Sequence, residues 1–286
     1  MNIIKDITTN SISEKSNIKN LKSFNKRYFY FNQIAKSDLS IVYDGIDIYN
    51  EYFKKDSNIV IKVPTKELLK MKDISAFVFS EYSFLRRLNS DSIVRVLDYG
   101  IDKKKKVPFL VLEKIEGQLL SEVSIFNLTK KDKKSIFKSL LNTLSYIHSK
   151  NIVHADISPS NIILNKNFEP IIFDFGISQN IETNDEFSLE YSKVKAFNPK
   201  YAAPELLVDK NIKPSVSTDI FSLACVMYEI FTNEALFINS SKELFDLPIE
   251  KRNLSKIPFF LRKWFKNSLS LDVKSRKIQK KYQKLL

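Results

Sequence analysis

The hydrophobic periodicity of this chain changes at the polar joint formed by residues 116–118. Before the joint, short runs rich in β-branched and aromatic residues are separated by polar segments, a pattern typical of strands. After it, apolar residues recur at the spacing of one helix face. The chain therefore predicts an α+β fold whose first part is a sheet and whose second part is mainly helical. The expected strands lie within residues 28–34, 40–43, 58–63, 94–99 and 109–112.

One helical segment interrupts the expected strands. Apolar residues recur on one helix face between Ile74 and Leu88, and Glu81 falls on the same stripe. A carboxylate on the buried face of a helix is costly unless it is paired. We therefore expect Glu81 to have a cationic partner.

Composition excludes several classes of function. The 286 residues carry a formal net charge of +13, but lysines are spread along the chain without a nucleic-acid-binding motif, so nucleic acid is not expected as a partner. The single cysteine, Cys225, lies in an apolar run and is expected in the core of a protein from a reducing compartment. No apolar run is long enough to span a membrane. These features favour a cytoplasmic protein, and delivery into a host cell stays open.

The chemistry-bearing residues lie in two short loops of the second part. Residues 152–164 contain Asp156 and, five positions later, Asn161, between two apolar runs. A short expected strand over residues 170–173 is followed by Asp174. Carboxylate and amide oxygens near strand ends suit a hard cation such as Mg²⁺.

These loops resemble the signature segments of eukaryotic-type protein kinases. The family's catalytic loop reads His-Arg-Asp with Asn five residues after the Asp, and its metal-binding motif reads Asp-Phe-Gly. This chain has His154-Ala155-Asp156, Asn161 and Asp174-Phe175-Gly176 in the corresponding places. Three further matches follow at plausible distances: Ala203-Pro204-Glu205, Asp219 at the start of an apolar helix, and Arg276, which in the family pairs with that Glu.

The resemblance implies a two-lobed kinase fold, with a small antiparallel N-lobe sheet carrying one main helix and a larger helical C-lobe. The domain would cover residues 28–286, with an N-lobe at about 28–112, a hinge at about 113–117 and a C-lobe at about 118–286. Residues 1–27 are polar and are expected to form a weakly ordered extension.

The resemblance also assigns roles to individual residues. Asp156 would act as the base, while Asn161 and Asp174 would hold Mg²⁺, with Mn²⁺ as an alternative ion. Lys62, between apolar residues of an expected strand, would clamp the α- and β-phosphates of ATP, and Glu81, 19 residues later, would fix it. Further residues expected to contact the nucleotide are Ala35, Ser37, Ser40, Val42, Val60, Glu113, Ile115, Ser158 and Ile163. Leu112 would be the gatekeeper, and an internal stack would comprise Leu85, Val96, His154 and Phe175.

The chain departs from the family pattern in three places. The phosphate-covering loop, Gly-x-Gly-x-x-Gly in the family, has Ala35, Ser37 and Ser40 in place of its glycines, which predicts a weaker grip on ATP. Ala155 replaces the family's arginine, so we expect constitutive activity or control by a partner in place of control through phosphorylation of Thr183, Ser188, Tyr191 or Ser192. Ser158 replaces a lysine and Asn198 a threonine, and a hydrogen bond between these two residues is the expected substitute.

The leading interpretation is a Ser/Thr-directed protein kinase that uses ATP and Mg²⁺. Two alternatives stay open: a pseudokinase that binds nucleotide or a partner without turnover, and a small-molecule phosphotransferase. His148, outside any motif at the end of an expected helix, is interpreted as structural. The resemblance implies a protein substrate but identifies neither that protein nor an oligomeric state.

Overall fold

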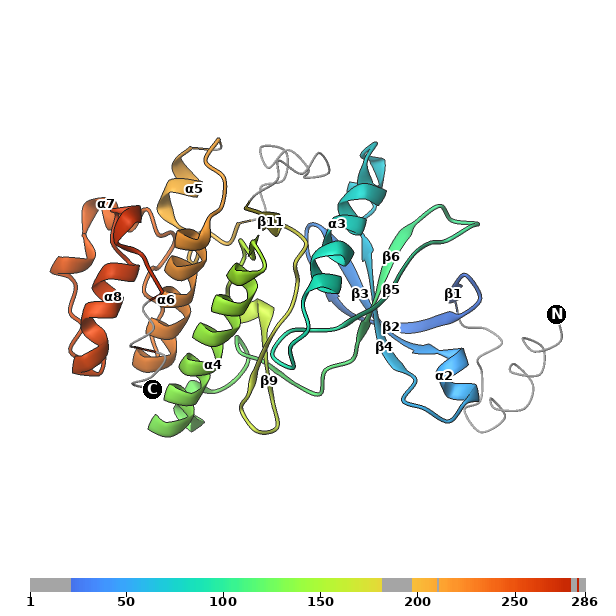
Figure 1. Ribbon diagram of the computed structural model, residues 1–286, viewed down its shortest axis with the longest axis horizontal. Helices are drawn as coiled ribbons and strands as arrows, with labels where there is room; N and C mark the ends of the chain where they lie inside the picture. The colour runs from blue at the N-terminus through green and yellow to red at the C-terminus, as the bar shows by residue number, and fades with distance from the viewer. Residues whose placement is uncertain (1–21, 182–196, 210, 279–281, 283–286) are drawn as a thin grey trace. The chain divides into compact units, whose positions relative to one another are not determined.

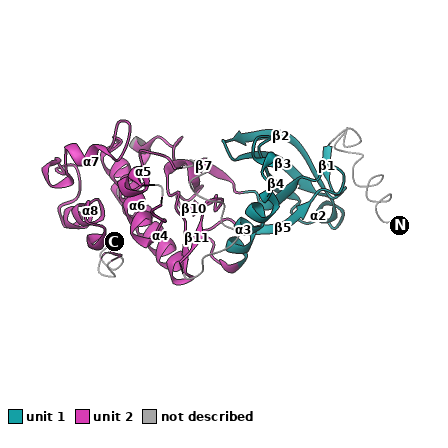
Figure 2. Ribbon diagram, turned by 90° about the horizontal axis from the view of Figure 1, so that it is seen from above, with its two compact units in different colours: residues 1–86, 95–114 teal, residues 87–94, 115–286 magenta. Residues whose placement is uncertain are grey.

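The computed structural model describes residues 22–181, 197–209, 211–278 and 282 (Figure 1). Contacts divide the chain into two compact units, which Figure 2 shows in different colours. Unit 1 comprises residues up to 86 together with 95–114, and unit 2 comprises residues 87–94 and 115–286. Unit 1 is built on an antiparallel sheet and unit 2 is mainly helical, which confirms the expected α+β class.

Unit 1 contains a six-stranded sheet in the order β1-β2-β3-β4-β6-β5, in which every neighbouring pair is antiparallel. Its strands are β1 (Lys22–Phe24), β2 (Tyr28–Lys36), β3 (Ser40–Asp47), β4 (Asn58–Pro64), β5 (Val96–Ile101) and β6 (Pro108–Glu113). Its helical segments are α2 (Ile48–Tyr52), the 3₁₀ turn η2 (Leu68–Lys70) and α3 (Ile74–Arg87). The five strands and the helix expected in this part of the chain are therefore present, with small changes in their bounds.

Side-chain alternation along β4 determines where Lys62 points. Ile59, Ile61 and Val63 share a buried cluster with residues from the first strands of the sheet. Lys62 points to the opposite face, because successive strand residues alternate, and it pairs in register with Leu110 of β6. Leu110 packs against Ile74 and neighbouring apolar residues of the α3 side. The sequence pattern therefore places the lysine on the sheet face that α3 covers.

The described part of unit 1 includes residues before the expected boundary at residue 28. Residues 22–24 form β1, and Phe24 is buried in the cluster that contains Phe109. The ring of Phe24 lies 4.8 Å from that of Phe109. The end of the expected extension, residues 1–27, thus belongs to the sheet, and residues 1–21 lie outside the described part of the chain.

Unit 2 is organised around two long helices. Its α-helices are α4 (Lys130–Ser149), α5 (Pro204–Val208), α6 (Val216–Thr232), α7 (Glu243–Asp246) and α8 (Arg262–Ser268). Two small sheets are formed by β7 (Gly117–Leu119), β9 (Ile162–Asn165) and β10 (Pro170–Ile172), and by β8 (Ile152–Val153) and β11 (Gln179–Asn180). The 3₁₀ turns are η3 (Ile125–Asn127), η4 (Pro159–Asn161), η5 (Ile249–Lys251), η6 (Phe259–Leu261) and η7 (Val273–Ser275).

Local sequence signals explain the two long helices. Thr129 and Asp132 form a capping box at the start of α4, with Thr129 Oγ1 accepting the Asp132 N–H at 3.2 Å. Helix α6 is buried on nearly all sides, as its apolar composition predicts. Phe137 of α4 meets Trp264 of α8 at 4.7 Å between ring centroids, which joins these helices in the core. Among the described residues, no helix has both the length and the apolar character needed to cross a membrane.

Residues 87–94 differ from the expected N-lobe assignment, because their hydrogen bonds are made to unit 2. The Val94 N–H donates to the Ile172 carbonyl at 3.0 Å, and the Ile172 N–H donates to the Ser92 carbonyl at 2.9 Å. Arg87 Nη2 also donates to the Lys150 carbonyl at 2.6 Å. The segment after α3 is therefore built onto β10, although it stands between two elements of unit 1 in the sequence.

Candidate active site

A buried ion pair joins β4 to α3 in unit 1. Lys62 Nζ lies 2.7 Å from Glu81 Oε1 and 2.8 Å from Oε2. Only 11% of the Lys62 side chain and 4% of the Glu81 side chain are exposed. The prediction that Glu81 has a cationic partner is confirmed, and two charges that would be costly alone compensate each other.

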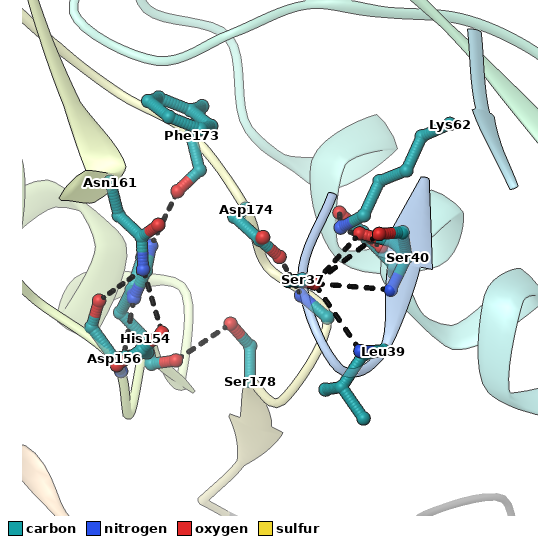
Figure 3. Close-up of polar contacts among 12 residues, drawn as sticks. Ser37, Leu39, Ser40, Lys62, His154, Asp156, Asn161, Phe173, Asp174 and Ser178 are labelled. Carbon is teal, nitrogen blue, oxygen red and sulfur yellow. Dashed lines mark hydrogen bonds and ion pairs between the residues drawn. The ribbon is translucent and has the colours of Figure 1, made fainter. Parts of the chain in front are cut away.

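The turn that takes the place of the glycine loop joins β2 to β3. Ala35 and Ser37 are exposed, and Ser40 is buried. Figure 3 shows Ser37 together with Leu39 and Ser40, with hydrogen bonds among them. The missing glycines have therefore not left an irregular loop, since a compact hairpin turn has formed.

The catalytic-loop residues are oriented by bonds within unit 2. Asn161 Nδ2 donates to the Asp156 carbonyl at 2.9 Å and to Asp156 Oδ2 at 2.7 Å (Figure 3). This double contact uses the amide nitrogen of Asn161, so Oδ1 is the amide atom suited to bind a cation. Ala155, the residue before Asp156, has φ of 70° and therefore lies in the left-handed region. The 3₁₀ turn η4 follows Asp156 and ends at Asn161, and the two hydrogen bonds hold these two residues together although they are five positions apart.

The ring of His154 forms two hydrogen bonds that hold this loop in place. Its Nδ1 accepts the Asp156 N–H at 3.2 Å, which leaves Nε2 to donate to the Phe173 carbonyl at 3.1 Å. Both contacts are satisfied by a neutral ring with its proton on Nε2. The ring also meets Phe175 at 4.6 Å between centroids. The expected contact between His154 and Phe175 is thus present, and the stack with Leu85 and Val96 of unit 1 stays a prediction.

Asp174 follows β10 in a left-handed conformation, with φ of 64°. Its Oδ1 accepts the Gly176 N–H at 3.2 Å. Two residues further on, Ser178 Oγ donates to the His154 carbonyl at 3.0 Å (Figure 3). Ser178 therefore connects the Asp174 segment to the catalytic loop. The sequence analysis did not identify this residue, and only its position two residues after Gly176 pointed to it.

Asp219 at the start of α6 anchors the catalytic loop. Its Oδ2 accepts the His154 N–H at 2.9 Å, and its Oδ1 accepts the Ala155 N–H at 2.8 Å. His148 Nε2 lies 2.8 Å from the same Oδ2. Asp219 is 0% exposed, so its charge is held by these three contacts. They give His148 the structural position expected for it.

Ser158 and Asn198 do not form the hydrogen bond that the sequence suggested. Ser158 is 1% exposed, and its Oγ lies 2.9 Å from Ser160 Oγ. Asn198 Oδ1 instead accepts the Lys200 N–H at 3.1 Å. Since Ser158 is buried against its own loop, the expected nucleotide contact from this residue has no support in the geometry.

The segment that corresponds to Ala-Pro-Glu forms an ion pair with Arg276, near the end of the chain. Glu205 accepts two hydrogen bonds from Arg276, at 2.6 and 3.1 Å. This is the pairing that the resemblance implied. The four hydroxyl residues through which control by phosphorylation was not expected, Thr183, Ser188, Tyr191 and Ser192, lie outside the described residues.

The residues expected around adenine are distributed over both units. In unit 1, Val60 pairs in register with Leu112, and both Val42 and Glu113 are half-buried. In unit 2, Ile115 and Ile163 are half-buried. The Glu113 N–H donates to the Arg95 carbonyl at 3.1 Å, so the expected adenine contact from Glu113 would fall to its carbonyl oxygen.

Asp174 and Asn161 fit a magnesium ion in their chemistry. One supplies carboxylate oxygens and the other an amide oxygen, which are the donors that Mg²⁺ prefers. Across the described residues, no group of three or more His, Cys, Asp or Glu side chains is arranged to hold a metal.

Cys225 is excluded from the chemistry. It is 1% exposed within α6. Burial raises the pKa of its thiol well above the ordinary value, which disfavours the reactive thiolate. The interpretation of Cys225 as a core residue is confirmed.

Comparison with known proteins gives one family. Residues 45–286 match the family model described as a protein kinase domain. The chain is 27% identical to cyclin-dependent kinase-like 2 of Pongo abelii over 234 residues, which are 79% of this chain and 45% of that protein. It is 26% identical to the carbon catabolite-derepressing protein kinase of Candida glabrata over 207 residues, 72% of this chain and 32% of that protein.

A third relative has a name that states its acceptor class. The chain is 27% identical over 231 residues to a probable serine/threonine-protein kinase of Dictyostelium discoideum, covering 79% of this chain and 52% of that protein. The chain thus spans only a third to about half of the length of these three relatives.

Proposed function

Since this chain belongs to the protein kinase family, we propose that it transfers the γ-phosphoryl group of ATP to hydroxyl groups of proteins, with serine and threonine as acceptors. The observation that carries this proposal is the double hydrogen bond from Asn161 to Asp156, at 2.9 and 2.7 Å. It orients a base and a metal ligand on one loop, and phosphoryl transfer depends on positioning more than on covalent chemistry by the protein.

Asp156 is the residue that would act on the acceptor. It is partly exposed, whereas His154 and Ala155 before it are buried. An incoming hydroxyl can therefore reach the Asp156 carboxylate and donate a hydrogen bond to it. As its oxygen bonds to the γ-phosphorus, the bond from that phosphorus to the β–γ bridging oxygen breaks, ADP leaves, and the hydroxyl proton passes to Asp156. The loop keeps its shape in this step, because its backbone is held by Asp219.

Asn161 and Asp174 would hold the magnesium ion that accompanies ATP. When bound, this ion supplies positive charge to the β- and γ-phosphates, where negative charge develops during transfer. The Asn161–Asp156 contact and the left-handed backbone of Asp174 prepare these two ligands before the ion arrives.

Lys62 would supply the second positive charge. In unit 1 its ammonium group is held by both carboxylate oxygens of Glu81. A lysine fixed in this way can donate to the α- and β-phosphates without the entropy cost of ordering a free side chain. Each unit thus contributes a distinct part of the proposed chemistry.

The serine/threonine preference is supported by the relatives. The Dictyostelium discoideum protein is named as a probable serine/threonine-protein kinase. The chain lacks the lysine and the threonine that such kinases usually place near the base, and has Ser158 and Asn198 there. Phosphoamino-acid analysis of the labelled product measures the acceptor class directly.

The test is a transfer assay with labelled ATP and Mg²⁺, with and without myelin basic protein, followed by phosphoamino-acid analysis. Asp156→Asn and Asp174→Asn should each lower the rate by about 10²-fold or more, because each removes a charge that acts in the transition state. Asp246→Asn, which changes an exposed carboxylate of α7, is the matched control. Equal rates in all variants, or bound nucleotide without any transfer, would contradict the proposal.

A further inference from the structure

In the turn between β2 and β3, the N–H groups of Ser37, Leu39 and Ser40 donate to acceptors within the turn itself. The Ser37 N–H donates to the Ser40 carbonyl at 2.8 Å. Ser37 Oγ then accepts the Leu39 N–H at 3.3 Å and the Ser40 N–H at 3.1 Å (Figure 3). One serine hydroxyl therefore satisfies the two backbone donors at the tip of the turn.

Thr65, just after β4, holds the same turn from the side. Its N–H donates to the Leu39 carbonyl and its Oγ1 donates to the Asp38 carbonyl, both at 3.0 Å. Thr65 is 2% exposed, so these bonds are shielded from water. The turn cannot lift away from the sheet without losing both of them.

The side chain of Leu39 makes a third attachment. It packs, partly buried, against the apolar cluster of Leu68, Ile74, Val78 and Leu110. Lifting the turn would expose this apolar surface to water, which is unfavourable. Backbone, hydroxyl and apolar contacts thus all favour one conformation of residues 37–40.

A phosphate group needs donors, and this turn offers it few. Phosphates bind to loops through backbone N–H groups that point at their oxygens. Here the N–H groups of Leu39 and Ser40 already have an acceptor, and the exposed Asp38 adds a negative charge beside them. A nucleotide phosphate would have to displace the Ser37 hydroxyl to reach either donor.

We propose that Ser37 is a positioning residue that, together with Thr65, withholds the turn's N–H groups from the nucleotide phosphates. Lys62 is then the residue of unit 1 that binds those phosphates. This inference rests on the proposed use of ATP, and it reverses the expectation that Ser37 and Ser40 bind the nucleotide. It attributes the weaker ATP binding expected from the missing glycines to the Ser37 hydroxyl, which a substitution can remove.

The test compares binding of ATP with Mg²⁺ and binding of adenosine, by calorimetry, for the wild type, Ser37→Ala, Ser37→Thr and Ser240→Ala. Ser37→Ala should bind ATP about two- to tenfold more tightly, the range expected for one or two recovered hydrogen bonds. Adenosine affinity should not change, because adenosine has no phosphate. Ser37→Thr keeps the hydroxyl and should resemble the wild type.

Ser240 is the matched control, because its Oγ accepts the Lys242 N–H at 3.2 Å in a turn of unit 2. Ser240→Ala should leave both affinities unchanged. Weaker ATP binding by Ser37→Ala would mean that the hydroxyl itself contacts phosphate, and unchanged ATP binding would mean that the turn's donors are not withheld. Either result would overturn the inference.

Amide exchange, measured by NMR without nucleotide, tests the hydrogen bonds from Leu39 and Ser40 to the Ser37 hydroxyl independently of the proposed function. The N–H groups of Leu39 and Ser40 should exchange more slowly in the wild type than in Ser37→Ala. Equal exchange rates in both proteins would show that the Ser37 hydroxyl does not protect these N–H groups and would overturn the inference. If no variant bound ATP while the exchange difference was present, the proposed function would fail, but the hydrogen bonds from Leu39 and Ser40 to the Ser37 hydroxyl would be confirmed.

Discussion

Arg276 and Glu205 form a two-point ion pair in the core of unit 2, with Nη1 2.6 Å from Oε1 and Nη2 3.1 Å from Oε2. The Arg276 side chain is 0% exposed. Its Nε donates to the Ser270 carbonyl at 2.8 Å, and its guanidinium lies 4.8 Å from the centroid of the Phe221 ring. One residue near the end of the chain thus holds α5, α6 and the segment before η7.

Arg276→Met should lower the free energy of unfolding by about 3–5 kcal/mol, because it leaves the Glu205 carboxylate without its buried partner. Urea unfolding at neutral pH measures this change. Lys256→Met is the matched control, since Lys256 pairs with Glu234 at a site where both side chains are more than half exposed. The control should cost less than about 1 kcal/mol. Equal losses in the two variants would show that the buried pair has no special role.

Lys62→Met should lower kcat/KM by about 10²–10³-fold, because it removes a positive charge aimed at the nucleotide. Glu81→Gln should lower kcat/KM by a smaller factor, since the lysine stays but is held less firmly. Because the two residues act as one unit, the double variant should lose little more than Lys62→Met alone. Kinetics of transfer to myelin basic protein measure all three variants.

For the Lys62 series, Lys166→Met is the control, because Lys166 pairs with Glu116 on the surface at 2.6 Å. It should have no effect on kcat/KM. Fully additive losses for Lys62 and Glu81 would argue that Glu81 acts independently of the lysine.

Asp219→Asn should lower kcat and also the free energy of unfolding, the latter by about 1–3 kcal/mol. An amide at this position brings an NH₂ group towards the N–H donors of His154 and Ala155, so at least one of them loses its acceptor. Asp209→Asn is the control, since Asp209 Oδ1 accepts a single N–H, from Asn211 at 2.8 Å, at an exposed site. Unchanged kcat in Asp219→Asn would mean that the catalytic loop does not depend on this anchor.

Asp102 predicts a pH-dependent contribution to stability in unit 1. Burial by itself raises the pKa of its carboxyl, but the backbone N–H groups of Lys105, Asn25 and Lys104 outweigh burial and hold the pKa below the ordinary value. The carboxylate form is therefore favoured in the folded state. Its stabilising effect is present above the unfolded-state pKa, about 3.9, and is lost as the pH falls through the lower folded-state value.

Asp102→Asn should therefore destabilise the protein by the same amount at pH 7 and pH 5, and by progressively less below about pH 4. Urea unfolding of both proteins across this range measures the difference. Asp246→Asn is the control and should change stability little at any of these pH values. A difference that grows towards low pH would have the wrong sign for this account.

Much of the candidate site was predictable because its residues follow local rules. Strand alternation placed Lys62 on one face of the sheet, and helical periodicity placed Glu81 on the inward stripe of its helix. A lysine among apolar strand residues and a glutamate on a buried stripe each need a partner, because burying an unpaired charge is costly, and the resemblance to protein kinases implied that they pair with each other. The spacing of Asp156, Asn161 and Asp174 within short loops was equally readable.

Other features depended on contacts between residues far apart in the chain. Asp219 accepts hydrogen bonds from residues 64 and 65 positions earlier, and nothing in its local pattern specifies those partners. The expected bond between Ser158 and Asn198 was wrong, because Ser160 stands close enough to satisfy Ser158 first. Residues 87–94 follow a helix of unit 1 but bond to β10, a choice that only the folded chain could make.

The sequence by itself determined the α+β class, the approximate bounds of the unit 1 strands and of α3, and the loops that carry Asp156, Asn161 and Asp174, while the resemblance to protein kinases implied the Lys62–Glu81 and Glu205–Arg276 pairs. Periodicity and turn signals act over a few residues and can be read along the chain, whereas the partners 19 and 71 positions apart came from the resemblance. Only the tertiary structure decided that Thr65 holds the turn between β2 and β3 against the sheet and that Asp219 holds the catalytic loop. Those hydrogen bonds form between groups whose proximity is set by packing, and packing cannot be read from the spacing of residues along the chain.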